Sequence, residues 1–254
     1  MKIILNGELT EITEETTEEL REGWFPDCNV VVVDGVPVTE DTWIEEYSRI
    51  YIGKCPGGLT DAITQRGNIS PLTDKTVGIA GAGGLGSNIA TFLARSGVGR
   101  IIIADYDRVE FSNLNRQVYN LNHLGLFKVD AISEVISAIN PEIEVIGFTE
   151  KLDEVNIPRI FSGCDVVCEA FDDPTEKAML VETVSAMGIP LVCGSGMAGI
   201  GDGEMKVRKL SDSIYVCGDG KSDLSKGVLA PRVAACAGVM ANKVLQILES
   251  GKDR

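Results

Sequence analysis

The stretch that decides the fold is GIAGAGGLGSN, residues 78–88. An apolar run at 77–80 leads into a glycine-rich turn at 81–86, and a helical pattern follows it. In a strand–turn–helix context, such glycines let backbone N–H groups approach phosphate at a helix N-terminus. Asp105 ends the next apolar run, where a carboxylate is placed to accept hydrogen bonds from a ribose. The stretch therefore predicts the start of a nucleotide-binding α/β fold.

Strands and helices alternate along the rest of the chain. Helical spacing of apolar residues indicates helices at 126–139 and from Pro231 to Glu249. Apolar, β-branched runs typical of buried parallel strands lie at 77–80, 101–105, 143–148, 165–170 and 190–193. We therefore predict an α/β class, with a Rossmann-like, doubly wound and mostly parallel sheet, over residues 75–254.

A glycine-rich segment separates the last predicted parallel strand from the C-terminal helix. Within it, EMKVRKL at 204–210 and SIYVC at 213–217 can form antiparallel strands. Long glycine-rich segments in compact domains are often lids or partner-binding elements. A poorly ordered surface excursion is the open alternative.

The first 58 residues form a different pattern. Their apolar runs suggest hairpins that turn at Asn6-Gly7 and Asp34-Gly35, and Thr16 with Glu19 fits a helix capping box. This ββαββ order predicts a small β-grasp (ubiquitin-like) module at 1–58. Residues 59–74, which begin just after Pro56-Gly57-Gly58, are the predicted linker.

Composition and charge argue against membrane-spanning, secreted and nucleic-acid-binding proteins. At 254 residues, with 44% hydrophobic residues, the chain can bury a full core, and no apolar run approaches the roughly 20 residues that span a bilayer. The N-terminus lacks the features of a signal peptide, so we expect a cytoplasmic protein without a membrane partner. A net charge of −15 argues against nucleic-acid binding. Of the first sixty residues, 13 are acidic and 4 are basic.

The seven cysteines show no C-x-x-C spacing, so they predict neither a disulfide framework nor a zinc site. We expect most of them to be small buried apolar residues.

The segment FSNLNRQ, residues 111–117, distinguishes a triphosphate site from a dinucleotide site. It supplies several hydrogen-bond donors after the ribose-binding strand, and Lys128 follows at the start of the next helix. Two cations, Arg116 and Lys128, suit a polyphosphate, and Asp172 after run 165–170 can ligate Mg²⁺. The alternatives are a surface ion pair of Arg116 with Asp105 or Asp107, a solvated Lys128, and a nicotinamide dinucleotide site.

With GAGGLGSN, D-Y-D-x-V-x-x-S-N-L-N-R-Q, LGLFKVDA and EAFDDP, residues 66–250 resemble the ThiF/MoeB/HesA family, relatives of ubiquitin-activating enzymes. The resemblance implies an adenylyltransferase that binds ATP and Mg²⁺ and adenylates the C-terminal glycine of a small β-grasp sulfur carrier. The motifs are most similar to ThiF-type proteins of thiamine biosynthesis, whose carrier is ThiS. A homodimer is implied as well, with Arg66 a loose match to an arginine that acts across the dimer.

The resemblance also assigns roles to individual residues. Those implied to surround phosphate are Gly81, Gly83, Gly84 and Gly86. Those implied to bind the nucleotide elsewhere are Asp105, Asp107, Asn113 and Gln117. Those implied to act in catalysis are Arg116, Lys128 and Asp172, with Asp172 as the metal ligand.

Two departures from the family pattern leave questions open. Members with a structural zinc have two C-x-x-C pairs, which this chain lacks, so no zinc is expected. Some relatives form a covalent carrier intermediate on a cysteine of the crossover segment; Cys217 or Cys193 occupies that region, and an inert thiol is the alternative.

The N-terminal module itself resembles ThiS, but its Gly57-Gly58 is internal and has no free carboxylate. We interpret it as a captive or degenerate carrier that assists dimerisation or occupies a docking surface. A β extension that stabilises the domain is the equal alternative.

The implied reaction needs no general base. An α-carboxyl group, with a pKa of roughly 3.3–3.7, is already ionised at neutral pH and can attack the α-phosphate of ATP. The single histidine, His123, is then expected to cap or pack. Other functions remain open: adenylation of another carboxylate, such as a modified tRNA base, or a non-catalytic nucleotide-binding scaffold.

Overall fold

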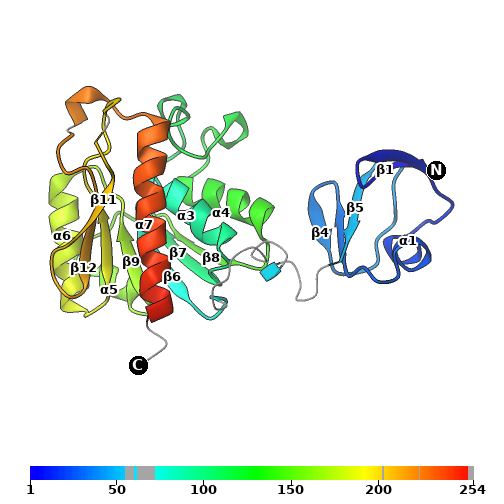
Figure 1. Ribbon diagram of the computed structural model, residues 1–254, viewed down its shortest axis with the longest axis horizontal. Helices are drawn as coiled ribbons and strands as arrows, with labels where there is room; N and C mark the ends of the chain where they lie inside the picture. Colours follow the sequence, from blue (N-terminus) through cyan, green and yellow to red (C-terminus); the bar gives the residue numbers. More distant parts are fainter. Residues whose placement is uncertain (55–59, 62–71, 202, 223, 251–254) are drawn as a thin grey trace. The chain divides into compact units, whose positions relative to one another are not determined.

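The computed structural model describes residues 1–54, 60–61, 72–201, 203–222 and 224–250 (Figure 1). The chain divides into two compact units: an N-terminal unit of residues 1–67 with 140–142, and a C-terminal unit of residues 68–139 with 143–254. Gly57-Gly58, Arg66 and most of the predicted linker lie outside the described residues, so the predictions made for them stay predictions. Among the described residues, no helix is long and apolar enough to cross a membrane.

The N-terminal unit is a five-stranded sheet with one helix, α1 (Thr17–Trp24). Its strands, in the sheet order β2-β1-β5-β3-β4, are β2 (Glu8–Glu11), β1 (Lys2–Leu5), β5 (Arg49–Gly53), β3 (Val30–Val33) and β4 (Val36–Val38). The parallel β1–β5 pair lies between two antiparallel hairpins. Both hairpins were predicted, whereas β5 was not. The sheet and α1 enclose a small core around Ile3, Leu20 and Ile50.

Local turn chemistry explains the two hairpins. Asn6 and Gly7 have φ of 49° and 91°, and Asp34 and Gly35 have φ of 51° and 87°. Positive φ at both central residues is the requirement of the type I′ turn, which Asn-Gly and Asp-Gly meet best.

The cap of α1 differs in part from the predicted capping box. Oγ1 of Thr16 accepts the N–H of Glu19 (3.4 Å), as predicted. The carboxylate of Glu19, however, accepts the N–H of Glu15 (3.1 Å), one residue before the cap.

The C-terminal unit is built on a seven-stranded sheet in the order β11-β12-β10-β9-β6-β7-β8. All neighbours pair in parallel except β11 and β12. In chain order the strands are β6 (Thr76–Ala80), β7 (Arg100–Ala104), β8 (Glu144–Phe148), β9 (Val166–Glu169), β10 (Leu191–Gly194), β11 (Lys206–Lys209) and β12 (Ile214–Gly218). Every predicted strand is found within a residue or two of its expected bounds.

Helices cover both faces of this sheet. One face carries α3 (Gly84–Arg95), α4 (Lys128–Ile139) and α7 (Ala230–Ser250); the other carries α5 (Asn156–Phe161) and α6 (Pro174–Ala186) (Figure 1). Short 3₁₀ helices at Phe111–Asn113, Leu121–His123 and Leu224–Lys226 lie in the connections. Two apolar cores, one on each side of the sheet, confirm the doubly wound Rossmann-like fold.

The order of the strands reverses between β6 and β9. The chain runs from β6 outward to β8, then returns to β9 and builds in the other direction. At such a reversal the connections after the two central strands diverge and leave a crevice at their carboxyl ends, where ligands bind in open α/β sheets. The glycine turn follows β6, and Asp172 follows β9, so both reach this crevice.

Candidate functional site

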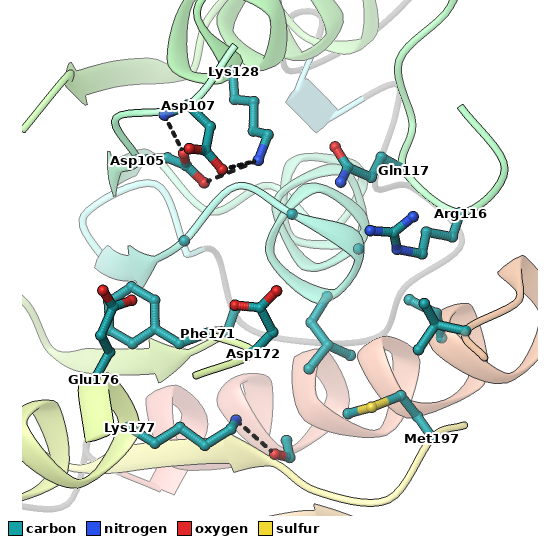
Figure 2. Close-up of a pocket in the computed structure, with 18 of the residues that line it drawn as sticks. Asp105, Asp107, Arg116, Gln117, Lys128, Phe171, Asp172, Glu176, Lys177 and Met197 are labelled. Carbon is teal, nitrogen blue, oxygen red and sulfur yellow. Dashed lines mark hydrogen bonds and ion pairs between the residues drawn. The ribbon is translucent and has the colours of Figure 1, made fainter. Parts of the chain in front are cut away.

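A cleft of about 800 Å³ opens at the carboxyl edge of the parallel strands in the C-terminal unit (Figure 2). This volume lies within the roughly 300–1,000 Å³ typical of small-molecule sites. Its lining includes ten of the eleven residues expected from the sequence, namely Gly81, Gly83, Gly84, Asp105, Asp107, Asn113, Arg116, Gln117, Lys128 and Asp172. The eleventh, Gly86, is buried and does not line the cleft.

The glycine turn is shaped by two close backbone approaches, one to the residue after β9 and one within the turn itself. Gly81 has φ of +97°, and a Cβ there would lie 3.0 Å from the carbonyl oxygen of Ala170. A Cβ on Gly86 would overlap the carbonyl oxygen of Gly81. Gly86 therefore allows α3 to start directly against the turn, a packing role in place of the implied phosphate contact. Gly83 caps α3 without a side-chain hydrogen bond, which leaves N–H groups of the first turn facing the cleft.

Asp105, Asp107 and Lys128 form one side of the cleft (Figure 2). The carboxylate of Asp105 accepts N–H groups from Ala82 (2.7 Å) and Asp107 (2.8 Å), which fixes it beside the glycine turn. Nζ of Lys128 donates to Oδ2 of Asp107 (2.7 Å) and lies 3.9 Å from Oδ2 of Asp105. Burial raises the pKa of Asp105 above its ordinary range, and the Lys128 ammonium opposes that rise. The Lys128 side chain is only 8% exposed, so the alternative of a solvated lysine is wrong.

Residues 111–117 form a second side of the cleft. Oδ1 of Asn113 accepts the N–H of Glu110 (3.0 Å) and caps the 3₁₀ turn. Nη1 of Arg116 donates to the carbonyl of Ser112 (2.8 Å) and to Oδ1 of Asn115 (2.9 Å). These two acceptors hold the guanidinium toward the cleft, away from Asp105 and Asp107, so the alternative ion pair is wrong.

Gln117 is the clearest unsatisfied group at the cleft. The residue is 8% exposed, and its Oε1 is buried without a hydrogen-bond partner among the described residues. Leaving a buried amide oxygen unpaired costs free energy, so such an atom beside a cleft indicates a position that a ligand completes.

A third side follows β9. Asp172 is exposed into the cleft, and among the described residues no hydrogen bond or ion pair involves its carboxylate. Three residues earlier, Glu169 is 1% exposed and pairs with Lys177 through both carboxylate oxygens, at 2.8 Å each. Burial raises the pKa of Glu169, and Lys177 opposes the rise. Sequence reasoning did not identify this pair; the only signal was a buried strand that ends in a carboxylate.

The glycine-rich segment supplies the remaining wall of the cleft. Its lining residues include Ser195, Met197, Ala198 and Ser222. The two antiparallel strands predicted within it are β11 and β12. Its loops are tied to the start of α7, where Nη2 of Arg232 donates to Oδ2 of Asp219 (2.5 Å) and Nη1 donates to the carbonyl of Gly201.

Oδ1 of Asp219 accepts N–H groups from Lys221 (2.8 Å) and Ser222 (2.9 Å). The Ser222 N–H is the largest of several causes that lower the pKa of Asp219 to about 2. The described part of the segment is thus a wall of the cleft that is held by its own hydrogen bonds.

The cysteines near this wall lie in the core. Cys217 is fully buried and Cys193 is 6% exposed. Burial raises the pKa of the Cys217 thiol to about 11 and that of Cys193 to about 12. Because the thiolate is the nucleophile, these environments favour inert thiols. His123 packs as expected: its Nδ1 accepts the N–H of Asn120 (3.0 Å) and completes a cap.

In the described part of the chain, no group of three His, Cys, Asp or Glu side chains is arranged to hold a metal ion. Asp172 is an exposed carboxylate that faces the cleft, has no partner among the residues described, and could serve as a cation ligand.

A family model described as the ThiF family matches residues 61–254. The chain belongs to the ThiF family. A second model, described as ThiS-like ubiquitin, matches residues 1–54, which agrees with the five-stranded N-terminal unit. The C-terminal unit is called the ThiF unit from here on, and the N-terminal unit the ThiS-like unit.

Curated relatives of the chain include two named as adenylyltransferase and sulfurtransferase. UBA4 of Yarrowia lipolytica is 29% identical over 192 residues, which cover 70% of this chain and 46% of that protein. MOCS3 of Caenorhabditis briggsae is 30% identical over 193 residues, which cover 69% of this chain and 46% of that protein. The chain thus spans less than half the length of the curated relatives it matches.

Among solved structures, the E. coli tRNA N6-threonylcarbamoyladenosine dehydratase TcdA is similar in fold. Its complex with AMP has 25% identity and a TM-score of 0.67, and the match covers 72% of this chain and 89% of that chain. Its complex with ATP has 26% identity and a TM-score of 0.66, and covers 76% and 91%.

Proposed function

We propose that this protein is an adenylyltransferase that transfers AMP from ATP to the C-terminal carboxylate of a small β-grasp carrier protein. One observation supports this above all: a single cleft gathers the glycine turn, Asp105, Arg116, Lys128 and Asp172. The names of the curated relatives support the activity, and the TcdA complexes with AMP and ATP support the nucleotide.

The residues present fit a triphosphate. Arg116 uses only Nη1 for its protein partners, so Nε and Nη2 are left for a ligand among the described residues. Lys128 makes one hydrogen bond to a carboxylate, and an ammonium has three donors. With the N–H groups at the start of α3, Arg116 and Lys128 place donors at separate points of the cleft, where a chain of three phosphates can meet them.

In the proposed reaction the carrier carboxylate attacks the α-phosphorus of ATP. A bond forms between carboxylate oxygen and phosphorus, the bond to the bridging oxygen of the β-phosphate breaks, and pyrophosphate leaves with its electron pair. Arg116 and Lys128 neutralise charge on the phosphates, and Asp105 orients the ribose. No proton is transferred, so positioning and electrostatics supply the rate.

Magnesium fits the same arrangement. Mg²⁺ binds through one or two carboxylates, phosphate oxygens and several waters, and Asp172 offers one exposed carboxylate. Bound there, the ion would supply further charge neutralisation of the phosphates. A structural zinc is not part of the proposal.

The test is carrier-dependent exchange of labelled pyrophosphate into ATP by the full chain, with mass spectrometry of a carrier that ends in Gly-Gly. We expect exchange and a carrier bearing one added AMP. Arg116→Ala should abolish both, whereas Arg100→Ala, on an exposed arginine that starts β7 at the opposite edge, should not. Exchange at the wild-type rate in Arg116→Ala would remove the site assignment.

We further propose that the carrier is ThiS-like and acts in thiamine biosynthesis. The sequence motifs and the ThiS-like unit support this choice, while the relatives named UBA4 and MOCS3 do not address it. Side-by-side exchange with a ThiS-like carrier and with a β-grasp carrier from another pathway decides the matter: a preference of tenfold or more for the second carrier would overturn it.

A carboxylate on a tRNA base is the second candidate, because TcdA, which is similar in fold, is named as an enzyme that modifies tRNA. The net charge of −15 opposes it, since tRNA binding requires a basic surface. Salt-dependent binding of tRNA to the full chain would favour this candidate over a carrier.

We also propose a homodimer and a cytoplasmic location. Both rest on the family resemblance and the sequence, and sedimentation of the full chain tests the first.

A further inference from the structure

An ion pair at the floor of the cleft has no part in the proposed chemistry. Glu169 ends β9 with 1% of its surface exposed, and Lys177 lies in the first turns of α6 with its side chain 29% exposed. A carboxylate this deeply buried is costly to desolvate, so its position beside a proposed reaction site needs an explanation.

Lys177 has no donor left for a substrate. An ammonium has three N–H donors, and Nζ of Lys177 donates to both oxygens of Glu169 (2.8 Å each) and to the carbonyl of Gly194 (3.1 Å). The three acceptors lie on β9 and β10, so the side chain ties α6 to the ends of two neighbouring strands. Its contacts are therefore those of a structural tie within the cleft floor.

Hydrogen bonds hold the backbone on both sides of Asp172, and the ion pair supplies the one before it. Before it, Oε1 of Glu169 accepts the N–H of Phe171 (2.7 Å). After it, Asp173 caps α6 by accepting the N–H groups of Thr175 (2.8 Å) and Glu176 (3.0 Å). Asp172 therefore stands in a short turn whose two ends are held, while its own carboxylate has no partner in the described part of the chain. Figure 2 shows Lys177 beneath this turn and Asp172 directed into the cleft.

We infer that Glu169 and Lys177 are positioning residues, which hold the turn 170–172 so that the Asp172 carboxylate faces the phosphates and their cation. The inference rests on the proposed function, because only a bound metal–nucleotide complex makes the orientation of Asp172 matter. Outer partners of this kind typically change metal affinity 10–100-fold when removed.

The test compares nucleotide binding with and without Mg²⁺, by titration calorimetry of the full chain with a non-hydrolysable ATP analogue. In Lys177→Met we expect metal-free affinity within about twofold of wild type, since Arg116, Lys128 and the glycine turn are unchanged. The gain in affinity on adding Mg²⁺ should fall about tenfold or more. Binding of Mn²⁺ to the protein–analogue complex, followed by electron paramagnetic resonance, should weaken in parallel.

Two variants serve as controls. Lys177→Arg keeps the charge and can bond both Glu169 oxygens through its planar fork, so it should recover most of the Mg²⁺ effect. Lys75→Met removes a partly buried lysine that pairs with the exposed Asp74 before β6, at the opposite edge of the sheet, and should behave as wild type. If Lys177→Met does not fold, Glu169→Gln takes its place: its amide offers one acceptor oxygen instead of two and sets an NH₂ donor against the Lys177 ammonium, so the tie is broken and the Mg²⁺ effect should be lost as well.

The outcomes separate the two proposals. Equal loss of affinity with and without Mg²⁺, or no loss in either condition, overturns the positioning role. Failure of the wild-type chain to bind the analogue at all instead overturns the proposed function.

Discussion

Two lysines face the same cleft from opposite sides, and they differ in what they have left to bind. Lys128 makes one hydrogen bond, to Asp107, and lies 3.9 Å from Asp105. Lys177 spends all three donors on Glu169 and Gly194. Figure 2 shows Lys128 above the cleft with its acidic partners and Lys177 below it. Two residues of the same type therefore stand in different environments: Lys128 can bind a ligand, whereas Lys177 is fully used by the protein.

This difference matters because charge alone does not identify a functional residue. The number of donors already satisfied decides whether an ammonium can respond to a phosphate. Removing Lys128 should therefore act chiefly on rate, and removing Lys177 chiefly on stability and on the geometry of Asp172.

The largest expected effect is that of Lys128→Met on rate. Loss of a preorganised charge at the phosphates should lower carrier-dependent pyrophosphate exchange about 10²–10³-fold. Initial rates at saturating carrier and ATP measure it, with Arg100→Ala as the matched control. A rate within threefold of wild type would make Lys128 structural like Lys177 and remove the contrast.

Lys177→Met should have the next largest effect, on stability. Removing one partner of a buried pair typically costs 3–5 kcal/mol, and we expect about 3 kcal/mol because Glu169 can take up a proton. Denaturant unfolding of the full chain measures it. A loss below about 1 kcal/mol would show that the pair is not a structural tie.

The stability deficit of Lys177→Met should depend on pH. Burial raises the folded-state pKa of Glu169 above its ordinary value, so the folded chain binds more protons than the unfolded chain between those two pKa values. The stability of the folded chain therefore falls as pH rises through that window. In Lys177→Met no ammonium opposes the rise in the Glu169 pKa, so the fall in stability is larger. The deficit should grow with rising pH and shrink on acidification; a deficit independent of pH would contradict this account.

Asp219→Asn should have a smaller effect, which is likewise lost on acidification but over a more acidic range. The Ser222 N–H, with other contacts, lowers the pKa of Asp219 from 3.8 to about 2, so its contribution is present above pH 3.8 and lost as pH falls to about 2. Because asparagine keeps one acceptor oxygen, we expect a loss of about 1 kcal/mol at neutral pH. Unfolding across a pH series tests this, and a difference that persists at the acid end would contradict it.

The smallest effect is expected for Cys217→Ala, which should leave the exchange rate within about twofold of wild type. Its thiol is fully buried and its pKa is raised to about 11, so little thiolate forms at neutral pH. Loss of a covalent carrier adduct in this variant would show that the segment opens to expose the thiol.

Local patterns predicted most of the ThiF unit. Apolar runs gave each parallel strand, and because carboxyl ends of parallel strands share one edge, residues as far apart as Gly81 and Asp172 were expected at one cleft. Asp105 was expected at the cleft because it ends a predicted strand, and Lys128 because it begins the following helix. The hairpins of the ThiS-like unit followed from Asn-Gly and Asp-Gly turns.

What the sequence could not predict depends on tertiary burial. Glu169 and Lys177 are eight positions apart, and their pairing follows from the depth of β9 in the sheet. The packing role of Gly86 comes from the approach of α3 to Gly81, which the motif does not specify. Strand β5 was missed because its alternation is short and it pairs with β1, far away in the chain.

A crystal structure of the full chain with Mg²⁺ and a non-hydrolysable ATP analogue is the most direct test of the nucleotide site. We predict the ribose at Asp105, the triphosphate between Arg116 and Asp172, and the α-phosphorus open to an incoming carboxylate. A nucleotide bound outside this cleft, or phosphates that contact neither Arg116 nor Lys128, would contradict the account.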